Sequence, residues 1–263
     1  MLQALEKGRS AVISFEFPVT ERTRILLRLE YLYGRLSYFV GKDDPYDHHA
    51  ALLVLFELME TASRADLKAD LLQELERQKQ VLEALRENPN VAEETLEGVL
   101  EEIERASGKL LALTGKFGQN LRENEWLMAI KQRAGIPGGT CQFDLPSYHL
   151  WQQRSAETRR QDLLRWAAPL MPTADASDIL LRLLRDSGKT HHYVARKGAF
   201  QQMSGGKVVQ LIRVAYDDNL ELLPELSANK YALNIRFINA VTGEARPRQI
   251  EQDVEFYLTN CKF

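Results

Sequence analysis

A thiol, a carboxylate and an imidazole lie close together in the segment IPGGTCQFDLPSYHLWQ, residues 136–152. Cys141, Asp144 and His149 are the residue types of a nucleophilic site, in which an imidazole activates a thiol and a third group orients the imidazole. The fold, not the sequence spacing, usually brings such partners together, and the spacing of Cys141 and His149 matches no local signature. The segment therefore leaves a thiol-dependent hydrolase using Cys141 and His149 as an alternative function.

The same segment has a simpler, structural interpretation. Gly135 can end the preceding helix, and the glycines of residues 137–139 can turn the chain, because glycine adopts backbone angles that other residues resist. Asp144 can cap a helix that begins at Pro146, since proline is favoured in the first turn. Cys141 is then a small buried side chain. This interpretation predicts a tightly folded corner without a catalytic residue.

The histidines give no stronger indication of chemistry. His48-His49 and His191-His192 are adjacent pairs, and adjacent residues point in different directions, so each pair offers a common ion one ligand at most. The sequence contains no CxxC, HExxH or GxSxG motif and no glycine-rich phosphate loop. We therefore expect no metal site, no cofactor and no enzymatic activity.

Composition places the chain among ordinary globular proteins. It has 263 residues, is 44% hydrophobic and carries a formal net charge of −3, which is not the basic excess of a nucleic-acid binder. Two cysteines suit a reducing compartment, and the longest apolar run, residues 50–56, is too short to span a bilayer. We expect a cytoplasmic protein that does not bind nucleic acid or insert into membranes.

The charge is unevenly distributed along the chain. Residues 66–105 hold twelve Asp/Glu and five Lys/Arg, a net charge of −7, so the remainder carries +4. An exposed acidic helical hairpin would account for the negative charge of residues 66–105. The positive charge of the remainder is also what we would expect of a protein that offers a basic face to an acidic partner.

Hydrophobic periodicity predicts the elements that carry these residues. Residues 11–17 alternate like a strand, and Thr20 can cap the helix that follows. Helical periodicity predicts further helices at 47–64, 66–87, 91–106, 117–134, 155–170 and 175–187. After Gly188 the period changes to two, which predicts strands at 191–203, 207–216, 231–238 and 250–258.

A run of helices followed by a run of strands predicts an α+β fold. We expect a mostly helical domain, 19–188, beside a small antiparallel β domain made of 11–17 plus 189–263. The N-terminal strand has no partner nearby in the sequence. It is therefore expected to pair with the C-terminal strands, so that the β domain is built from both chain ends.

The segment FGQNLRENEWLMAIKQRAGIPGGTCQFDLPSYHLWQ, residues 117–152, resembles the core signature of the ZapD family, the Z-ring-associated cell division proteins. Residues 21–32, 71–85 and 229–238 resemble the first helix, the long helix and a late strand of that family. The resemblance implies a non-enzymatic homodimer at the division site. It also implies that the protein binds the acidic C-terminal tail of FtsZ and cross-links FtsZ filaments into bundles, which stabilises the Z-ring at midcell.

An acidic tail calls for arginines, whose planar guanidinium can grip a carboxylate with two hydrogen bonds. Some candidates lie on one stripe of the first helix or at the end of a helix. Others point outward on the late strand or stand at a position of the family motif. The candidates are Arg24, Arg28, Arg64, His149, Lys230 and Arg236. A single arginine is more often a solvated charge or part of an intramolecular salt bridge. Glu125 and Ala232 stand where the resemblance implies a basic residue, which predicts a smaller or shifted basic surface.

Overall fold

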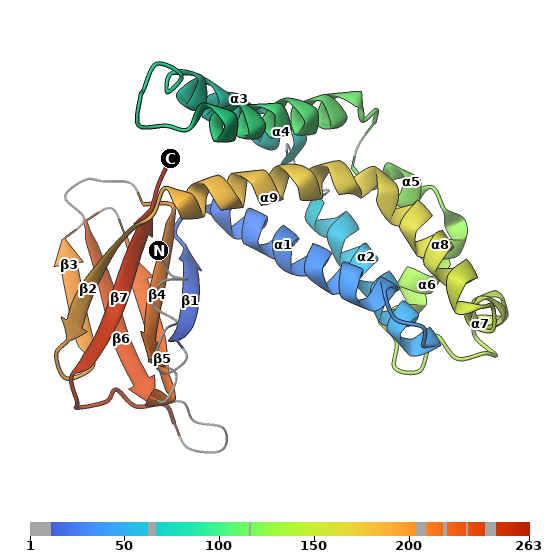
Figure 1. Ribbon diagram of the computed structural model, residues 1–263. Coiled ribbons are helices and arrows are strands. Elements are labelled where there is room, and N and C mark those ends of the chain that lie inside the picture. The colour runs from blue at the N-terminus through green and yellow to red at the C-terminus, as the bar shows by residue number, and fades with distance from the viewer. Residues whose placement is uncertain are drawn as a thin grey trace. The chain divides into compact units, whose positions relative to one another are not determined.

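The computed structural model describes residues 12–62, 67–115, 117–203, 209–217, 220–229, 231–239 and 246–263. The chain forms two compact units (Figure 1). One is Ile25–Leu181, and the other combines the N-terminal segment up to Arg24 with Arg182–Phe263. The domain boundaries predicted from the sequence, 19–188 and 11–17 plus 189–263, stay a prediction. No helix in the described part of the chain is long and apolar enough to cross a membrane.

The helical unit is built from helices of very different lengths. The helices, with their full bounds, are α1 (Glu21–Val40), α2 (Pro45–Ala62), α3 (Leu67–Glu83), α4 (Glu93–Ala112), α5 (Gln119–Arg122), α6 (Glu125–Ala134), α7 (Pro146–Gln152), α8 (Ala156–Ala167), the 3-10 helix η2 (Ala168–Leu170) and α9 (Met171–Asp186). The first turn of α1 and the last turn of α9 belong to the other unit.

Helices α1 and α2 follow directly from their sequence patterns. The Thr20 hydroxyl accepts a hydrogen bond from the backbone N–H of Thr23 at 3.2 Å, so the predicted cap of α1 is confirmed. On α1, Leu26 and Leu29 are buried, whereas Arg28 between them is exposed. Helix α2 contains the apolar run 50–56 and is buried along most of its length, as expected for a helix that is hydrophobic on all sides.

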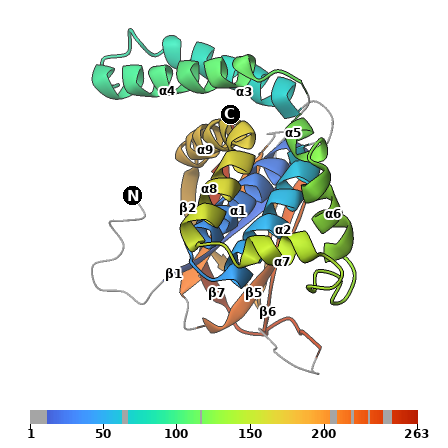
Figure 2. The same ribbon diagram turned by 90° about the vertical axis from the view of Figure 1, so that its right-hand side faces the viewer.

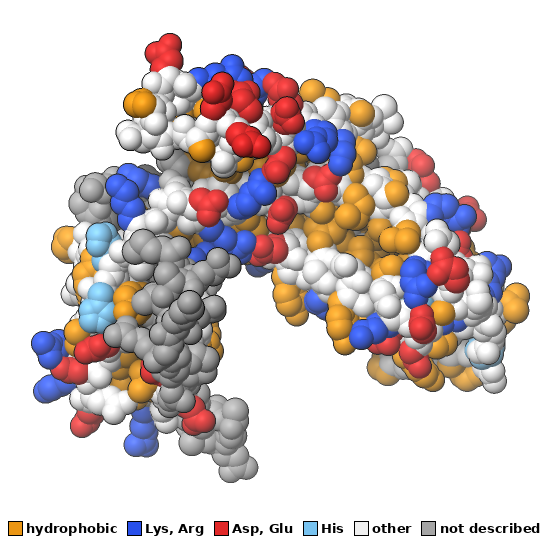
Figure 3. Space-filling model, in the orientation of Figure 1, with side chains coloured by type: hydrophobic (Ala, Val, Ile, Leu, Met, Phe, Trp, Pro, Cys, Tyr) orange, Lys and Arg blue, Asp and Glu red, His pale blue; other side chains and the backbone are white. Residues whose placement is uncertain are grey.

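Helices α3 and α4 lie side by side in both ribbon views (Figures 1 and 2) and form the predicted hairpin. Buried leucines of α3 and buried apolar residues of α4 make the contact. Ion pairs join the exposed faces, with Lys79 bonded to Glu104 at 2.7 Å and Arg86 to Glu97 at 2.8 Å. Asp and Glu side chains gather over this hairpin in Figure 3.

The predicted helix 117–134 was wrong as one helix, because the structure divides it. Asn124 has an extended backbone, and its side chain accepts a hydrogen bond from the N–H of Leu127 at 3.1 Å, so that it caps α6. Gly135 stands at the C-cap of α6, as predicted. The predicted start of the last helix at 175 was also wrong. Helix α9 begins at Met171, because Pro172 fits the first turn, where no N–H partner is needed.

The other unit contains two antiparallel sheets. Their strands are β1 (Val12–Pro18), β2 (Lys189–Ala195), β3 (Ala199–Met203), β4 (Leu211–Asp217), β5 (Leu222–Ala228), β6 (Ala232–Asn239) and β7 (Val254–Cys261). The orders are β1-β4-β7-β2 and β3-β6-β5. Strand β1 pairs with β4 from Val12 opposite Asp217 to Pro18 opposite Leu211. The predicted α+β fold, with a β region built from both chain ends, is therefore confirmed.

Buried residues of both sheets form one hydrophobic core. Tyr216 of β4, Phe237 of β6 and Phe256 of β7 are its largest side chains, and the Phe237 ring contacts each of the other two at a centroid distance of 5.4 Å. On β6 the burial alternates as the sequence predicts, with Ile235 buried and Arg236 exposed. Face-to-face packing of two sheets thus leaves the outward side chains of β6 in solvent.

Two predictions about the strands were wrong. The segment 191–203 forms two strands, because Lys197 and Gly198 have φ of 48° and 70° and turn the chain between them. A Cβ at Gly198 would lie 2.7 Å from the Ile250 side chain, so only glycine fits this position without a shift. Strand β5 was missed because Pro224 interrupts its pattern. Proline is tolerated there because β5 is an edge strand.

Candidate functional site

The candidate basic residues differ in what surrounds them. Arg64 and Lys230 lie outside the described residues. Arg24 is exposed and pairs with Glu21 one turn earlier, at 2.9 Å. Arg236 is also exposed, and its Nε donates to Glu225 on the neighbouring strand β5 at 3.1 Å. Both guanidinium groups therefore already have a carboxylate partner within the chain.

Arg28 is different, because its side chain makes no hydrogen bond or ion pair in the part of the chain that the structure describes. It is exposed and lines a groove of about 560 Å³ formed by α1, α2 and α6. The lining residues, which we call the Arg28 groove, are Arg28, Tyr31, Leu32, Phe56, Glu57, Glu60, Thr61 and Lys131. The groove belongs entirely to the helical unit.

The Arg28 groove combines an apolar floor with charges on its rim. Leu32 and Phe56 are almost fully buried, whereas the Tyr31 ring is 66% exposed and presents an aromatic surface. The rim carries Arg28 and Lys131 together with Glu57 and Glu60. Such a surface can bind a peptide that has an apolar side chain and at least one carboxylate.

Two intramolecular ion pairs flank the groove. Lys131 of α6 bonds Glu60 of α2 at 2.8 Å, and Arg35 of α1 lies 3.4 Å from Glu57 of α2. The Arg35 guanidinium also lies over the Tyr31 ring, 5.5 Å from its centroid, which is a cation–π distance. Helix α2 therefore holds a cation on each side.

Neighbouring helices fix the walls of the groove. Arg122 of α5 donates to the carbonyl of Phe117 at 2.8 Å and to that of Met59 on α2 at 3.2 Å. The Asn124 cap then starts α6, the helix that carries Lys131. Sequence periodicity shows which side of each helix faces outward, but it does not show that α1, α2 and α6 share a groove.

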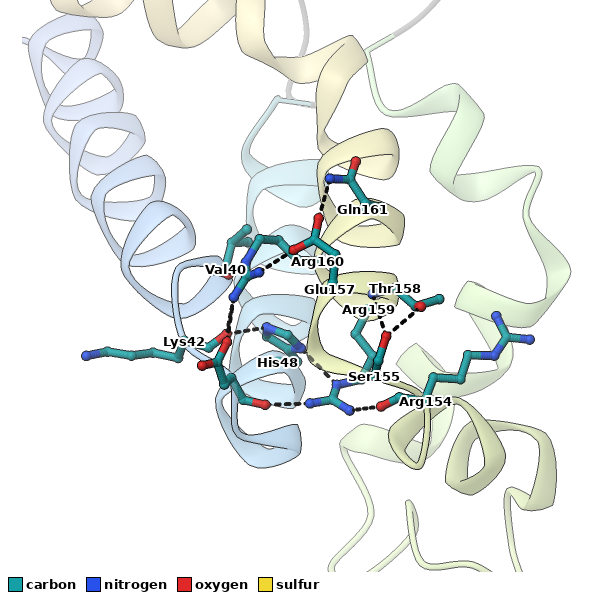
Figure 4. Close-up of polar contacts among 11 residues, drawn as sticks. Val40, Lys42, His48, Arg154, Ser155, Glu157, Thr158, Arg159, Arg160 and Gln161 are labelled. Carbon is teal, nitrogen blue, oxygen red and sulfur yellow. Dashed lines mark hydrogen bonds and ion pairs between the residues drawn. The ribbon is translucent and has the colours of Figure 1, made fainter.

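Figure 4 shows a second polar cluster, where a buried arginine ties the turn between α1 and α2 to α8. The Arg159 side chain is only 4% exposed. It donates to Nδ1 of His48 and to the carbonyl of Gln152, each at 2.9 Å, and also to the carbonyls of Arg154 and Asp43. This cluster was missed from the sequence, since nothing in an Arg-Arg pair indicates that one member is buried.

The hydrogen bonds of Arg159 determine the state of His48. Because arginine only donates, Nδ1 of His48 must accept, and Nε2 then carries the hydrogen that it donates to the Lys42 carbonyl at 2.7 Å. Burial is the main cause that lowers the pKa of His48, and the positive charges of Arg159 and Arg160 lower this pKa further. His48 is therefore a neutral structural residue.

Arg160 completes the cluster at the C-terminus of α1. It donates to the carbonyl of Val40 at 3.1 Å and pairs with the carboxylates of Asp43 and Glu157, each at 2.6 Å. A cation is favourable at a helix C-terminus, where unpaired carbonyls carry partial negative charge. The cluster therefore stabilises the end of α1, far along that helix from Arg28.

The corner 136–152 does not assemble a thiol–imidazole pair. The Cys141 thiol donates to Asp144 at 3.4 Å, and Arg133 contacts the same carboxylate at 3.3 Å. His149 is partly exposed, and within the described residues its side chain makes no hydrogen bond. Among those residues, no group of three or more His, Cys, Asp and Glu is placed to hold a metal ion.

Two structural predictions about this corner were wrong. Leu145, not Asp144, stands at the N-cap of α7, and no side chain caps that helix. The carboxylate of Asp144 is instead engaged by Cys141 and Arg133. The Cys141 side chain is partly exposed, not buried.

Aromatic residues fill the space behind the corner. The three tryptophans of the chain, Trp126, Trp151 and Trp166, form one cluster with centroid distances of 5.6–6.0 Å. Tyr148 joins this cluster and bonds His49 of α2 at 2.6 Å. The corner therefore anchors α6, α7 and α8 together.

Comparison with known proteins gives one consistent match. A family model described as ZapD, a cell division protein, matches residues 27–236. A cell division protein ZapD from Chromobacterium violaceum is 92% identical over 252 residues, which cover 96% of this chain and 100% of that protein. The chain belongs to the ZapD family. ZapD proteins from Azoarcus sp. and Dechloromonas aromatica are each 54% identical over 250 residues, which cover 95% of the chain and 99% of each relative.

Membership of the ZapD family confirms the resemblance seen in the sequence and places the chain among cell division proteins. The match includes all of the Arg28 groove, since residues 28–131 lie within the range 27–236. It also includes the corner 136–152, whose contacts are those of a packing element and not of a catalytic pair. The groove is therefore the stronger candidate for the functional site.

Proposed function

We propose that this protein is a non-enzymatic adaptor that binds the acidic C-terminal tail of FtsZ and cross-links FtsZ filaments into bundles. It acts in the cytoplasm at the division site, where bundling stabilises the Z-ring. The observation that carries the proposal is the nearly full-length match to cell division proteins of the ZapD family, at 92% and 54% identity. The Arg28 groove supplies a matching surface.

Arg28 supports this proposal because it is an exposed cation with no hydrogen-bond or ion-pair partner for its side chain among the residues that the structure describes. A carboxylate of the tail can bind it without first breaking an ion pair. The adjacent Tyr31, Leu32 and Phe56 offer apolar contact to a neighbouring side chain of the same peptide. We propose that the other candidates also contribute basic charge to the interaction: Arg24, Arg64, His149, Lys230 and Arg236.

Cross-linking requires at least two tail sites on one particle. We propose that the protein is a homodimer, because twofold symmetry duplicates any site on the chain. Two linked sites that engage two filaments give bundling without any further contact. The binding should weaken as salt is added, because exposed charge pairs are screened.

The first experiment mixes the purified protein with FtsZ and GTP and measures pelleting and light scattering. Full-length FtsZ is compared with FtsZ that lacks its C-terminal tail. Bundling that depends on the tail supports the adaptor function. Bundling of both forms would show that the tail is not the ligand, and the absence of bundling by a folded protein would contradict the proposed function.

A further inference from the structure

The Arg28 groove already contains carboxylates of its own. Glu57 and Glu60 lie one turn apart on α2, and both line the groove. Glu60 bonds Lys131 at 2.8 Å. The Glu60 carboxylate thus offers Lys131 what a carboxylate of an acidic peptide would offer it, and the charges of the four charged lining residues sum to zero.

We propose that Glu60 is an internal competitor for the ligand of this groove and limits its affinity for acidic peptides. It occupies Lys131, so a peptide carboxylate reaches that ammonium group only when Glu60 moves away. This inference rests on the proposed function and deepens it. The fitting ligand is a peptide segment with two carboxylates, one for Arg28 and one for Lys131, and an apolar side chain for Tyr31.

The exchange at Lys131 is physically feasible. Its side chain is 34% exposed and that of Glu60 is 59% exposed. An ion pair this open to solvent contributes only about 0–1 kcal/mol, so its replacement by an equivalent pair costs little. Lysine also carries its charge on a flexible stem with three rotatable donors, which lets it follow a new carboxylate.

The opposite side of the groove provides an internal comparison. Arg35 contacts Glu57 at the longer distance of 3.4 Å and also lies over the Tyr31 ring. The guanidinium therefore keeps one of its two contacts when Glu57 is removed. Neutralising Glu57 should therefore increase the affinity of the groove for an acidic peptide less than neutralising Glu60 does.

The test measures the affinity of the full chain for a fluorescent synthetic peptide of the FtsZ C-terminal tail by anisotropy. Glu60→Gln should lower Kd about two- to fivefold, the range that corresponds to an exposed ion pair. Glu57→Gln should lower it less. Glu94→Gln is the matched control, because Glu94 is exposed on α4 outside the groove, and it changes the net charge equally without changing Kd.

The same substitution in a Lys131→Met variant distinguishes the release of Lys131 from a general change in the electrostatic potential of the groove. In Lys131→Met protein, Glu60→Gln should give a smaller gain in affinity, since the Lys131 ammonium group is no longer there to be released. A gain of undiminished size in that background, or a Kd for Glu60→Gln that is unchanged or raised, would overturn the inference. If the folded wild-type protein does not bind the peptide at all, the proposed function fails as well. If the wild-type protein binds the peptide but Glu60→Gln does not bind it more tightly, the inference about Glu60 is refuted and the proposed function stands.

Discussion

Residues of one type have different roles here because their surroundings differ. Arg24 and Arg236 are exposed but paired, Arg159 is buried and bonded to backbone carbonyls, and Arg28 is exposed and unpaired among the described residues. An arginine that already has a carboxylate must exchange one partner for another when it binds a ligand. For this reason Arg28 should contribute more to ligand binding than the paired Arg24 and Arg236.

Charge reversal at Arg28 tests this difference. Arg28→Glu should raise the Kd for the FtsZ tail roughly tenfold, about 1.4 kcal/mol, because it removes an attraction and adds a repulsion. The same change at Arg64 and Arg236 as well should abolish bundling while the helical content and the dimer persist. Arg105→Glu is the control, since Arg105 is exposed on α4 away from the groove. A fully active triple variant would mean that the tail binds another face.

His48 makes a pH prediction possible at the same scale. Burial lowers the pKa of His48 below its ordinary value of 6.5. As pH falls below about 6.5, the unfolded chain takes up a proton that the folded chain refuses, so the free energy of unfolding decreases. Protonation would also place a second donor against the Arg159 guanidinium.

Thermal unfolding followed by circular dichroism between pH 7.5 and 5 measures this effect. The Tm of His48→Gln should fall less steeply with pH than that of the wild-type protein, because glutamine keeps an acceptor and a donor but does not titrate. The pH profile of His49→Gln is measured for comparison, since burial also lowers the pKa of His49, which bonds Tyr148 and not Arg159. Parallel pH profiles for wild type and His48→Gln would show that the Arg159 cluster tolerates a charged imidazole.

At the scale of elements, short helices position the groove. Helix α6 carries Lys131, and α6 begins where Asn124 interrupts the helical pattern of residues 117–134. The cap was hidden in the sequence because an asparagine between two glutamates fits a helix surface as well as a helix start. The structure shows which of the two it is, because Asn124 has an extended backbone and its side chain accepts from the Leu127 N–H.

Removal of the cap should weaken this element specifically. Asn124→Ala should destabilise the protein by about 1 kcal/mol, because the Leu127 N–H loses its acceptor. Urea unfolding gives the value. Asn120→Ala is the control, since Asn120 is exposed on α5 and makes no hydrogen bond through its side chain among the described residues. Equal stability of the two variants would indicate that α6 is held by packing alone.

At the scale of the whole molecule, the sign of charge is segregated. Residues 66–105 carry a net −7 and the rest of the chain carries +4. The α3–α4 hairpin binds several of its own carboxylates in ion pairs such as Lys79–Glu104. An acidic ligand is repelled by this hairpin and directed to the remaining surface.

A cross-linker with two sites has a characteristic dependence on stoichiometry. Light scattering of FtsZ filaments should first rise as the protein is added and then fall at large excess, because each tail then binds its own dimer and bridges are lost. Titration at constant FtsZ concentration measures the curve. A steady rise to a plateau at high excess would contradict bridging by two independent tail sites.

The sequence by itself determined the elements whose local signals agree with the fold. The Thr20 cap, the apolar run of α2 and the alternation on β6 could be predicted because each depends on neighbouring residues only. The resemblance carried by residues 117–152 also identified the family. Arg28 and Arg236 could be selected as outward basic residues by the same local periodicity.

Only the tertiary structure decided which of these residues form a site. The sequence did not show that Arg236 bonds Glu225 while Arg28 has no ion pair within the described part of the chain, because each ion pair depends on where another strand or helix lies. The burial of Arg159 and the Glu60–Lys131 pair have the same origin. Periodicity fixes the direction of a side chain relative to its own helix or strand, whereas its partners are set by contacts between residues far apart in the chain.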